Sequence, residues 1–288
     1  MKIGVMKMNR MEKMLKKGKI EKLVPINGGG LTGEVHLLEY KSKKYILRRC
    51  RDAEAVREYI SIVEKYKKYG FFPKLLGKHN TDLLFEFIDG REVRREREFL
   101  KTFEQIGKIA AQINKVKYKG ETSEKFVRRV NALVTGNYKG YEKKRSKKPK
   151  IFTKKEGEKI IKTYKYLVNV CKPKIVFDIN DVTHSNFIVT KKGKVFLVDI
   201  GAVRPLTKGY GVAKCFLQVS KKESQQKAFL KGYSSISSIK FLTQEYYDLI
   251  YLSFFVLKAI RKVAYFESEV APYILNKINK IVKRYKNE

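Results

Sequence analysis

Tryptophan is absent from this 288-residue sequence, and cysteines, acidic residues and long apolar runs are scarce. The three cysteines lie far apart without a CxxC or Cys/His spacing, which argues against a zinc site or a disulfide framework. The most apolar stretch, 249–260, is interrupted by Ser253 and Lys258 and is too short to span a bilayer. The basic N-terminus lacks the continuous apolar core of a secretion signal. We therefore expect a cytoplasmic protein with no transmembrane segment.

Positive charge is present in large excess, with 65 Lys and Arg residues against 29 Asp and Glu residues and a formal net charge of +36. Solubility does not require this imbalance, because mixed charges keep a protein soluble with less self-repulsion. The excess predicts a polyanionic partner, either a nucleic acid or an anionic membrane surface. Residues 138–155 interleave Lys and Arg with aromatic rings, which favours contacts with phosphates and unpaired bases. A solvated insertion is the alternative for this segment.

Hydrophobic periodicity divides the chain near residue 90 into a small, β-rich part and a mainly helical part. Apolar residues at helical spacing predict a helix over 53–68, with Asp52 as its N-cap and Gly70 at its end. We expect an α+β chain with a basic arm, or helix, at 1–18, an N-lobe (19–90) and a C-lobe (91–288). The predicted strands are 22–26, 35–39, 45–49, 75–78, 83–87, 187–190 and 194–198, and the further helices are 96–115, 123–135, 155–170, 225–233, 243–263 and 271–285.

A glycine cluster lies between two predicted strands. Residues 28–35 read GGGLTGEV, a GxGxxGxV pattern that is built on Gly28, Gly30 and Gly33. Such glycines let backbone N–H groups approach phosphates without a Cβ atom in the way. A dinucleotide-binding fold would need a helix after the glycines, but the next residues, VHLLEYKSKKYILRR, are strand-like. The cluster therefore predicts a phosphate-binding turn, with a simple flexible turn as the alternative.

The strongest chemical signal combines Asp181, Asn186 and Asp199. The hairpin predicted between the last two runs out from Asn186 and back to Asp199, so both side chains should lie at its open end. An amide oxygen and a carboxylate are hard ligands that suit Mg²⁺ carrying the phosphates of ATP. Asp181 lies one loop earlier, where it can accept a proton from an attacking hydroxyl. These parts together predict phosphoryl transfer from ATP with Mg²⁺ as cofactor.

Residues 28–35, 181–186 and 199–201 resemble the glycine-rich loop, the catalytic loop and the DFG motif of protein-kinase-like enzymes. The resemblance implies a two-lobed fold and an ATP-dependent phosphotransferase with an alcohol group as acceptor. After Gly201 the sequence has no APE motif and no long activation loop. It therefore resembles the atypical and small-molecule branches, which include Rio-type kinases, aminoglycoside and choline phosphotransferases and lipopolysaccharide sugar kinases.

The same resemblance implies further nucleotide-binding residues. The strand 44–48 falls where the family has its phosphate-binding lysine, and we assign this role to Arg48, with Lys44 as the second choice. The ion-pair partner should lie on the following helix, where Glu58 is our choice and Glu54 its rival. The hinge, whose backbone would bind adenine, is placed at Glu86 and Phe87.

The acceptor is predicted from charge together with the resemblance. A kinase that phosphorylates a hydroxyl on a polyanion needs a basic surface, which favours RNA as the partner. Some archaeal and thermophile kinases of this fold phosphorylate a ribose 2′-hydroxyl of tRNA, and the resemblance implies that Asp181 would act on that 2′-OH. The alternatives are a lipopolysaccharide-core sugar kinase in contact with an anionic membrane, an RNA-binding pseudokinase and an atypical protein kinase.

Overall fold

The computed structural model describes residues 8–22, 33–94, 98–116, 118, 151–220, 222–266 and 270–288. The chain forms two compact units. The first comprises residues 1–116, 179–204 and 214–237, and the second comprises 117–178, 205–213 and 238–288. Because the chain returns to the first unit at residue 179, the predicted catalytic segment shares one unit with the N-terminal sheet. The boundary between lobes near residue 90 stays a prediction.

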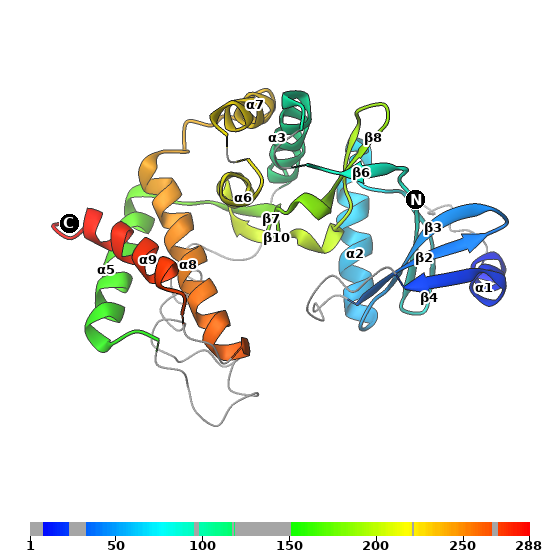
Figure 1. Ribbon diagram of the computed structural model, residues 1–288, viewed down its shortest axis with the longest axis horizontal. Helices are drawn as coiled ribbons and strands as arrows, with labels where there is room; N and C mark the ends of the chain where they lie inside the picture. The colour runs from blue at the N-terminus through cyan, green and yellow to red at the C-terminus, as the bar shows by residue number, and fades with distance from the viewer. Residues whose placement is uncertain are drawn as a thin grey trace. The chain divides into compact units, whose positions relative to one another are not determined.

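A five-stranded antiparallel sheet forms the N-terminal part and includes the strands labelled β2, β3 and β4 in Figure 1. Its strand order is β1-β2-β3-β5-β4. The turn between β2 and β3 is Lys41-Ser42, and both residues have positive φ angles, which is typical of the two-residue turns that join twisted antiparallel strands. The strands predicted from alternation are confirmed from residue 34 onward, whereas residues 23–26 lie outside the described residues. The bounds are β1 (Lys19–Lys22), β2 (Glu34–Tyr40), β3 (Lys43–Arg49), β4 (Leu75–His79) and β5 (Asp82–Glu86).

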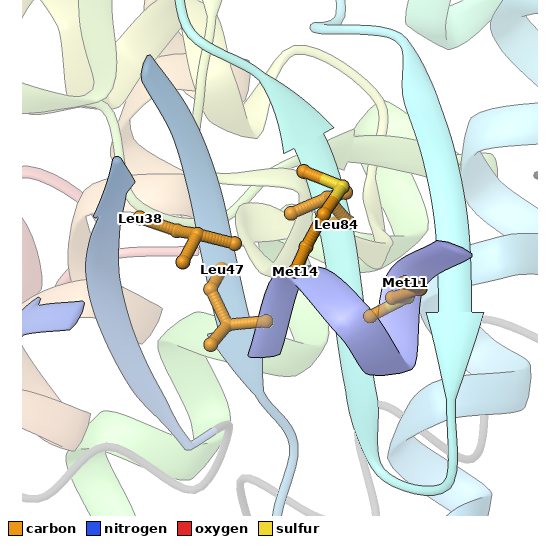
Figure 2. Close-up of a cluster of buried hydrophobic side chains, with 5 residues drawn as sticks. All are labelled: Met11, Met14, Leu38, Leu47 and Leu84. Carbon is orange, nitrogen blue, oxygen red and sulfur yellow. The ribbon is translucent and has the colours of Figure 1, made fainter. Parts of the chain in front are cut away.

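Helix α1 (Met8–Lys17) packs against this sheet through its methionines (Figure 2). Met11 and Met14 are each 1% exposed and lie over Leu38, Leu47 and Leu84, which are fully buried. The two methionines are three residues apart, so they share one face of the helix. Of the two alternatives for the basic segment 1–18, an arm or a helix, the structure has a helix over Met8–Lys17, and its apolar face belongs to the core.

Helix α2 (Ala53–Tyr66) begins as predicted and ends two residues before the predicted end at residue 68. The carboxylate of Asp52 accepts a hydrogen bond from the backbone N–H of Ala55 at 2.8 Å, which confirms the N-cap. The helix continues into the short helix η1 (Lys67–Tyr69) and stops at Gly70, whose φ is +64°. A left-handed residue at this place favours glycine.

A second, three-stranded sheet has the order β6-β8-β9. The β8–β9 hairpin was predicted, whereas β6 was not. The turn of the hairpin is held by helix α3, because the side chain of Gln105 donates to the carbonyl of Gly193 at 2.8 Å and accepts from the N–H of Val195 at 3.2 Å. Helix α7 packs on α3 in the same unit. The bounds are β6 (Gly90–Glu92), β8 (Phe187–Thr190), β9 (Val195–Leu197), α3 (Leu100–Asn114) and α7 (Glu223–Ser234).

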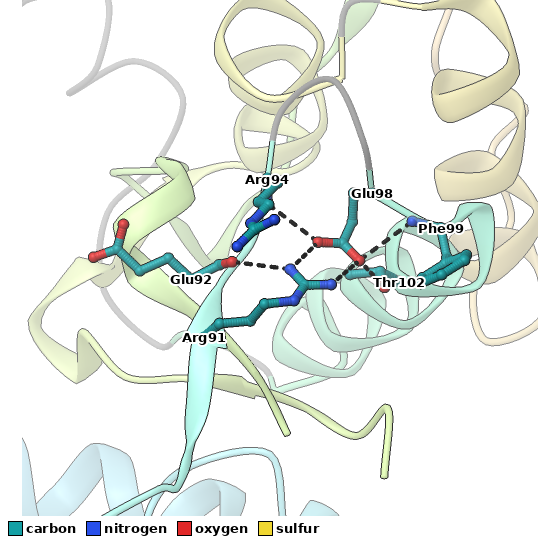
Figure 3. A network of polar contacts seen from close by, with 6 residues as sticks. All are labelled: Arg91, Glu92, Arg94, Glu98, Phe99 and Thr102. Atoms are coloured by element: carbon teal, nitrogen blue, oxygen red, sulfur yellow. Dashed lines mark hydrogen bonds and ion pairs between the residues drawn. The ribbon is translucent and has the colours of Figure 1, made fainter. Parts of the chain in front are cut away.

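A buried carboxylate joins β6 to the start of α3 (Figure 3). Glu98 receives two hydrogen bonds from the guanidinium of Arg91, at 2.6 and 3.0 Å, and further bonds from the N–H of Arg94 and the hydroxyl of Thr102. Burial by itself would raise the pKa of Glu98, but these donors, Arg91 foremost, lower the pKa from 4.5 to about 2. The charged form of Glu98 is therefore part of the folded structure.

The second unit is mainly helical. Its core includes Tyr210, Ala213, Tyr246 and Ile250. Asp248 of α8 is buried, is ion-paired with Arg284 and accepts a hydrogen bond from the hydroxyl of Tyr285 at 2.8 Å, so it fixes α9 to α8. No helix among the described residues is long and apolar enough to cross a membrane. The bounds are α5 (Lys154–Cys171), α8 (Gln244–Phe266) and α9 (Pro272–Arg284).

Besides β6, the sequence did not predict strands β7 (Ile175–Ile179) and β10 (Val203–Thr207) or helix α6 (Tyr210–Gln218). Strands β7 and β10 are short and pair with each other. Helix α6 contains a glycine, and most of its residues are buried, so it shows no alternation of polar and apolar faces. The predicted helix 123–135 lies outside the described residues.

The packing of α1 can be tested with Met14→Ala. Because the side chain is buried against the sheet, we expect the free energy of unfolding to fall by about 2–5 kcal/mol. Met14→Leu, which nearly conserves the volume, should cost less than about 1.5 kcal/mol. The measurement is urea denaturation of all three proteins. Equal stability of Met14→Ala and the wild type would show that α1 does not dock.

The Glu98 network predicts a pH-dependent stability. Because the folded-state pKa of Glu98 lies below its ordinary value, its contribution is full above pH 4.5 and is lost as the pH falls towards 2. Arg91 is 38% exposed, so Glu98→Gln should lower the free energy of unfolding at pH 7 by about 1.5–3 kcal/mol, as for a hydrogen bond to a charged group. This difference from the wild type should shrink below pH 4.5. Glu92→Gln, in which an exposed side chain is changed, is the control. A difference that does not change with pH would contradict the assignment.

Candidate functional site

The structure brings Asn186 and Asp199 together at the open end of the β8–β9 hairpin. Phe187 pairs with Leu197 in the hairpin register, and the N–H of Val198 donates to the carbonyl of Asn186 at 2.9 Å. The residue that follows Val198 is Asp199, so the expected neighbourhood of an amide and a carboxylate is found. Helix η3 (His184–Asn186) links this end to the loop that carries Asp181.

Asn186 is tied to the candidate base. Its side-chain N–H donates to the backbone carbonyl of Asp181 at 2.7 Å, and Asn186 is 4% exposed. Because the two polar atoms of an amide point in different directions, this bond turns the Asn186 oxygen away from the Asp181 carbonyl. The loop is fixed further by the N–H of Asn180, which donates to the carbonyl of Ala202 at 2.6 Å.

Asp199 begins helix η4 (Ile200–Ala202), and its carboxylate accepts from the N–H of Gly201 at 3.1 Å. The guanidinium of Arg48 lies close to this carboxylate, with 3.7 Å between Nη1 and Oδ1. Burial raises the pKa of Asp199, and the charge of Arg48 opposes that rise, while the charge of Asp181 adds to it. A carboxylate in this setting gains from a second positive charge nearby.

Arg48, and not Lys44, faces this site. Arg48 is 8% exposed, and its guanidinium lies 4.4 Å from the centre of the Tyr59 ring on α2. Lys44 is on the same face of β3 by alternation, but its side chain is half exposed and pairs with Glu39 at 3.7 Å. The position of Arg48 is thus compatible with the predicted contact to phosphates, which stays a prediction.

Glu58 is held by a residue that the sequence had not indicated. Its carboxylate accepts from Nη1 of Arg204 at 3.1 Å, and Arg204 lies five residues beyond Asp199. We had expected Glu58 to pair with Arg48. Glu54, the rival, lies in the exposed first turn of α2. Nothing in the local sequence distinguishes Arg204 from the many other basic residues of the chain.

Gly33 is the described member of the predicted phosphate-binding turn, since Gly28 and Gly30 lie outside the described residues. Its φ is +103°, and a Cβ atom there would lie 1.8 Å from the carbonyl oxygen of Arg49. Only glycine permits this approach to the end of β3. Packing against the end of β3 therefore requires glycine at position 33, whether or not Gly33 also contacts a nucleotide.

The predicted hinge follows β5. The N–H of Glu86 donates to the carbonyl of Lys74 at 3.0 Å, and the Glu86 carboxylate accepts from the N–H of Lys74 at 2.8 Å. Glu86 thus holds the end of the sheet. Phe87 is the first residue beyond it and is 38% exposed. Its role in binding adenine stays a prediction.

The site offers few protein ligands for a metal ion. Among the residues that the structure describes, no group of three or more His, Cys, Asp and Glu could hold a metal ion. Asn186 and Asp199 offer two hard oxygen ligands side by side. Mg²⁺ often takes only one or two protein ligands and completes its shell with phosphates and water, so this pair fits Mg²⁺ that arrives with a nucleotide.

Solved structures with the same fold are phosphotransferases. Choline kinase LicA from Streptococcus pneumoniae is 17% identical, with 97% of this chain and 100% of that chain covered and a TM-score of 0.64. Ethanolamine kinase from Plasmodium vivax is 13% identical, with coverages of 94% and 83% and a TM-score of 0.65. Spectinomycin phosphotransferase APH(9)-Ia, in complex with ADP and spectinomycin, is 15% identical, with coverages of 96% and 93% and a TM-score of 0.62. These likenesses confirm the predicted α+β, two-lobed, protein-kinase-like fold.

The sequence itself identifies the family. No curated protein sequence matches significantly. The family model described as choline/ethanolamine kinase matches residues 24–251, which is most of the chain and includes every predicted site residue. The prediction of an ATP-dependent kinase with an alcohol group as acceptor is confirmed. The chain belongs to the choline/ethanolamine kinase family, in the atypical branch of the protein-kinase-like superfamily.

Proposed function

We propose that this kinase transfers the γ-phosphate of ATP to the hydroxyl of a small-molecule alcohol. The observation that carries the proposal is the family match over residues 24–251. The names of the similar solved structures point the same way, since they specify choline, ethanolamine and spectinomycin as the compounds acted on. An alcohol of this class needs only one hydroxyl placed in line with the γ-phosphate.

Asp181 has the role of the base in this proposal. It lies in the loop before η3, and its backbone carbonyl is bonded to Asn186, so base and metal ligand are held in one short segment. A carboxylate at this point accepts the proton of the acceptor hydroxyl as the phosphoryl group is transferred.

Asn186 and Asp199 would hold Mg²⁺, which neutralises charge on the phosphate oxygens during the transfer. The Asp199 side chain is 26% exposed and has the guanidinium of Arg48 at 3.7 Å, and a carboxylate in this position suits a divalent cation. Arg48 would contact the phosphates, since it reaches the same carboxylate from β3. Gly28, Gly30 and Gly33 would cover the phosphates, and Glu86 and Phe87 would provide the backbone that binds adenine.

RNA is a second candidate for the acceptor, and its support is electrostatic. The family and the names of the relatives do not support it, but a net charge of +36 exceeds what a small acceptor requires. The described surface adds a groove of about 580 Å³ between α3 and α7 that is lined by four lysines and one glutamate. Two of the lysines, Lys108 and Lys231, pair with Glu104. Residues 138–150 of the basic and aromatic segment lie outside the described residues.

An acceptor panel separates these candidates. Purified protein with γ-labelled ATP and Mg²⁺ should label choline, ethanolamine or another small alcohol, and Asp181→Asn should abolish the label. Core lipopolysaccharide, total tRNA and a reaction without acceptor are offered in parallel. Label in tRNA alone would overturn the small-alcohol proposal. RNA binding through six to ten phosphates would then weaken roughly 10³–10⁵-fold between 50 and 200 mM salt.

Replacing each of the two carboxylates by its amide should impair different properties of the enzyme, kcat in one variant and Mg²⁺-ADP affinity in the other. Asp181→Asn should lower kcat by about 10²–10⁴-fold, because it removes the base, while leaving the affinity for Mg²⁺-ADP within a factor of about two. Asp199→Asn should weaken Mg²⁺-ADP binding by at least about tenfold and leave metal-free ADP binding intact, because it changes a metal ligand. Steady-state kinetics measures kcat, and calorimetric titration with and without Mg²⁺ measures the affinity of each variant for ADP. The same loss of Mg²⁺-ADP affinity in both variants would contradict the division of roles.

A further inference from the structure

Arg204 connects helix α2 to the segment that follows Asp199. Its Nε donates to the carbonyl of Gly201 at 3.0 Å, and its Nη1 donates to the carboxylate of Glu58 at 3.1 Å. One planar guanidinium thus holds two partners from parts of the chain 143 residues apart, as the difference between 201 and 58 shows.

Gly201 relays this contact to the candidate metal ligand. Its carbonyl accepts from Arg204, while its own N–H donates to Oδ1 of Asp199 at 3.1 Å. The two bonds lie on opposite ends of the same residue. The bond from Arg204 thus restrains the backbone of the residue whose N–H is the donor to Asp199.

Helix α2 and the 199–204 segment also contact each other directly. A Cβ atom at Gly201 would lie 2.3 Å from the hydroxyl oxygen of Tyr59, which is 2% exposed on α2. Tyr59 in turn lies under the guanidinium of Arg48. The position of Asp199 relative to Arg48 is thus set by how closely α2 approaches the 199–204 segment.

The Glu58–Arg204 pair contributes little to folding by itself. The side chains of Arg204 and Glu58 are 36% and 52% exposed. Ion pairs this exposed stabilise a protein by about 0–1 kcal/mol. The effect of the pair should therefore show in the geometry of the site and not in global stability.

We propose that Arg204 is a positioning residue, which, with Glu58 as its anchor, holds Gly201 and thereby the Asp199 carboxylate in the orientation that binds the metal of the metal–nucleotide complex. The proposal rests on the proposed role of Asp199. It gives Glu58 a function different from the expected pairing with Arg48: the Glu58 carboxylate fixes the metal-binding segment through Arg204.

The variants are Arg204→Gln, Arg204→Lys, Glu58→Gln and the double variant Glu58→Gln/Arg204→Gln. The matched control is Glu64→Gln, because Glu64 lies on the same helix and forms an exposed ion pair with Lys67 at 3.8 Å, away from Gly201. Binding of ADP is measured by calorimetry with and without Mg²⁺, and the Tm of each protein is measured without ligand. No acceptor is needed, so the result does not depend on which alcohol is phosphorylated.

Arg204→Gln should bind Mg²⁺-ADP about 10–100-fold more weakly, as is typical when a residue that orients a metal ligand is lost. Metal-free ADP binding and the Tm should match those of Glu64→Gln. Arg204→Lys should recover part of the loss, since one ammonium reaches Glu58 or Gly201 but not both in the same geometry. The double variant should be no weaker than the weaker single variant, because the two residues act as one unit.

Three results would overturn the proposal. Mg²⁺-ADP affinity in Arg204→Gln equal to that of Glu64→Gln would remove the positioning role. A fall in Tm that accounts for the loss of binding would make Arg204 a folding residue. If Mg²⁺ does not change the affinity of the wild type for ADP, Asp199 has no role in metal binding and the proposed function itself is wrong. This outcome is seen in the wild type alone, so it is distinguishable from the other two.

Discussion

The antiparallel pairing of β8 with β9 is the constraint on which the site depends. The two strands have four and three residues, and a hairpin of this length is marginal on its own. Three supports compensate for the short strands: β6 adds a third strand, Gln105 of α3 bonds both sides of the turn, and the N–H of Leu197 donates to the carbonyl of Phe71. None of these supports has a proposed role in the reaction, yet they keep Asn186 and Asp199 side by side.

The second requirement is that α2 and β3 reach the same point from the N-terminal sheet. Arg48 at the end of β3 and Tyr59 on α2 stack against each other, and Gly201 fits against the Tyr59 hydroxyl because it has no side chain. Glycine is therefore required at position 201 so that the 199–204 segment can pack closely against α2. A larger residue would push η4, and with it Asp199, away from Arg48.

The sequence predicted those parts of the fold that local signals determine. The helix after Asp52 has an N-cap, an apolar face and a glycine stop, and the β8–β9 hairpin has two alternating strands around a Lys-Lys-Gly turn. Helix α6 was missed because it is buried on most sides and so lacks a periodic pattern. Asp181, Asn186 and Asp199 could be found because their spacing is local to one loop and one hairpin.

Contacts between distant segments could not be predicted in the same way. Strand alternation places Lys44 and Arg48 on one face of β3, so periodicity does not choose between them. In the structure Arg48 is buried and stacks on Tyr59 of α2, a contact that the local sequence does not reveal. The partner of Glu58 is a similar case. With 65 basic residues in the chain, the choice depends on which one lies next to α2 in space, and β10 begins one residue before Arg204 and places it there.

The net charge of the protein acts differently on an acceptor at long range and within the site. A charge of +36 attracts ATP and other anions over long distances, but at physiological salt such fields are screened beyond about 8 Å. Choline and ethanolamine carry a positive charge, and a strongly basic protein would repel them at long range.

Within the site, however, the electrostatic field is that of nearby groups, and Asp181 and Asp199 are both carboxylates. A cationic alcohol that approaches with its hydroxyl towards Asp181 is then attracted at short range in spite of the overall charge. A net charge of +36 is therefore compatible with a small cationic acceptor in the site.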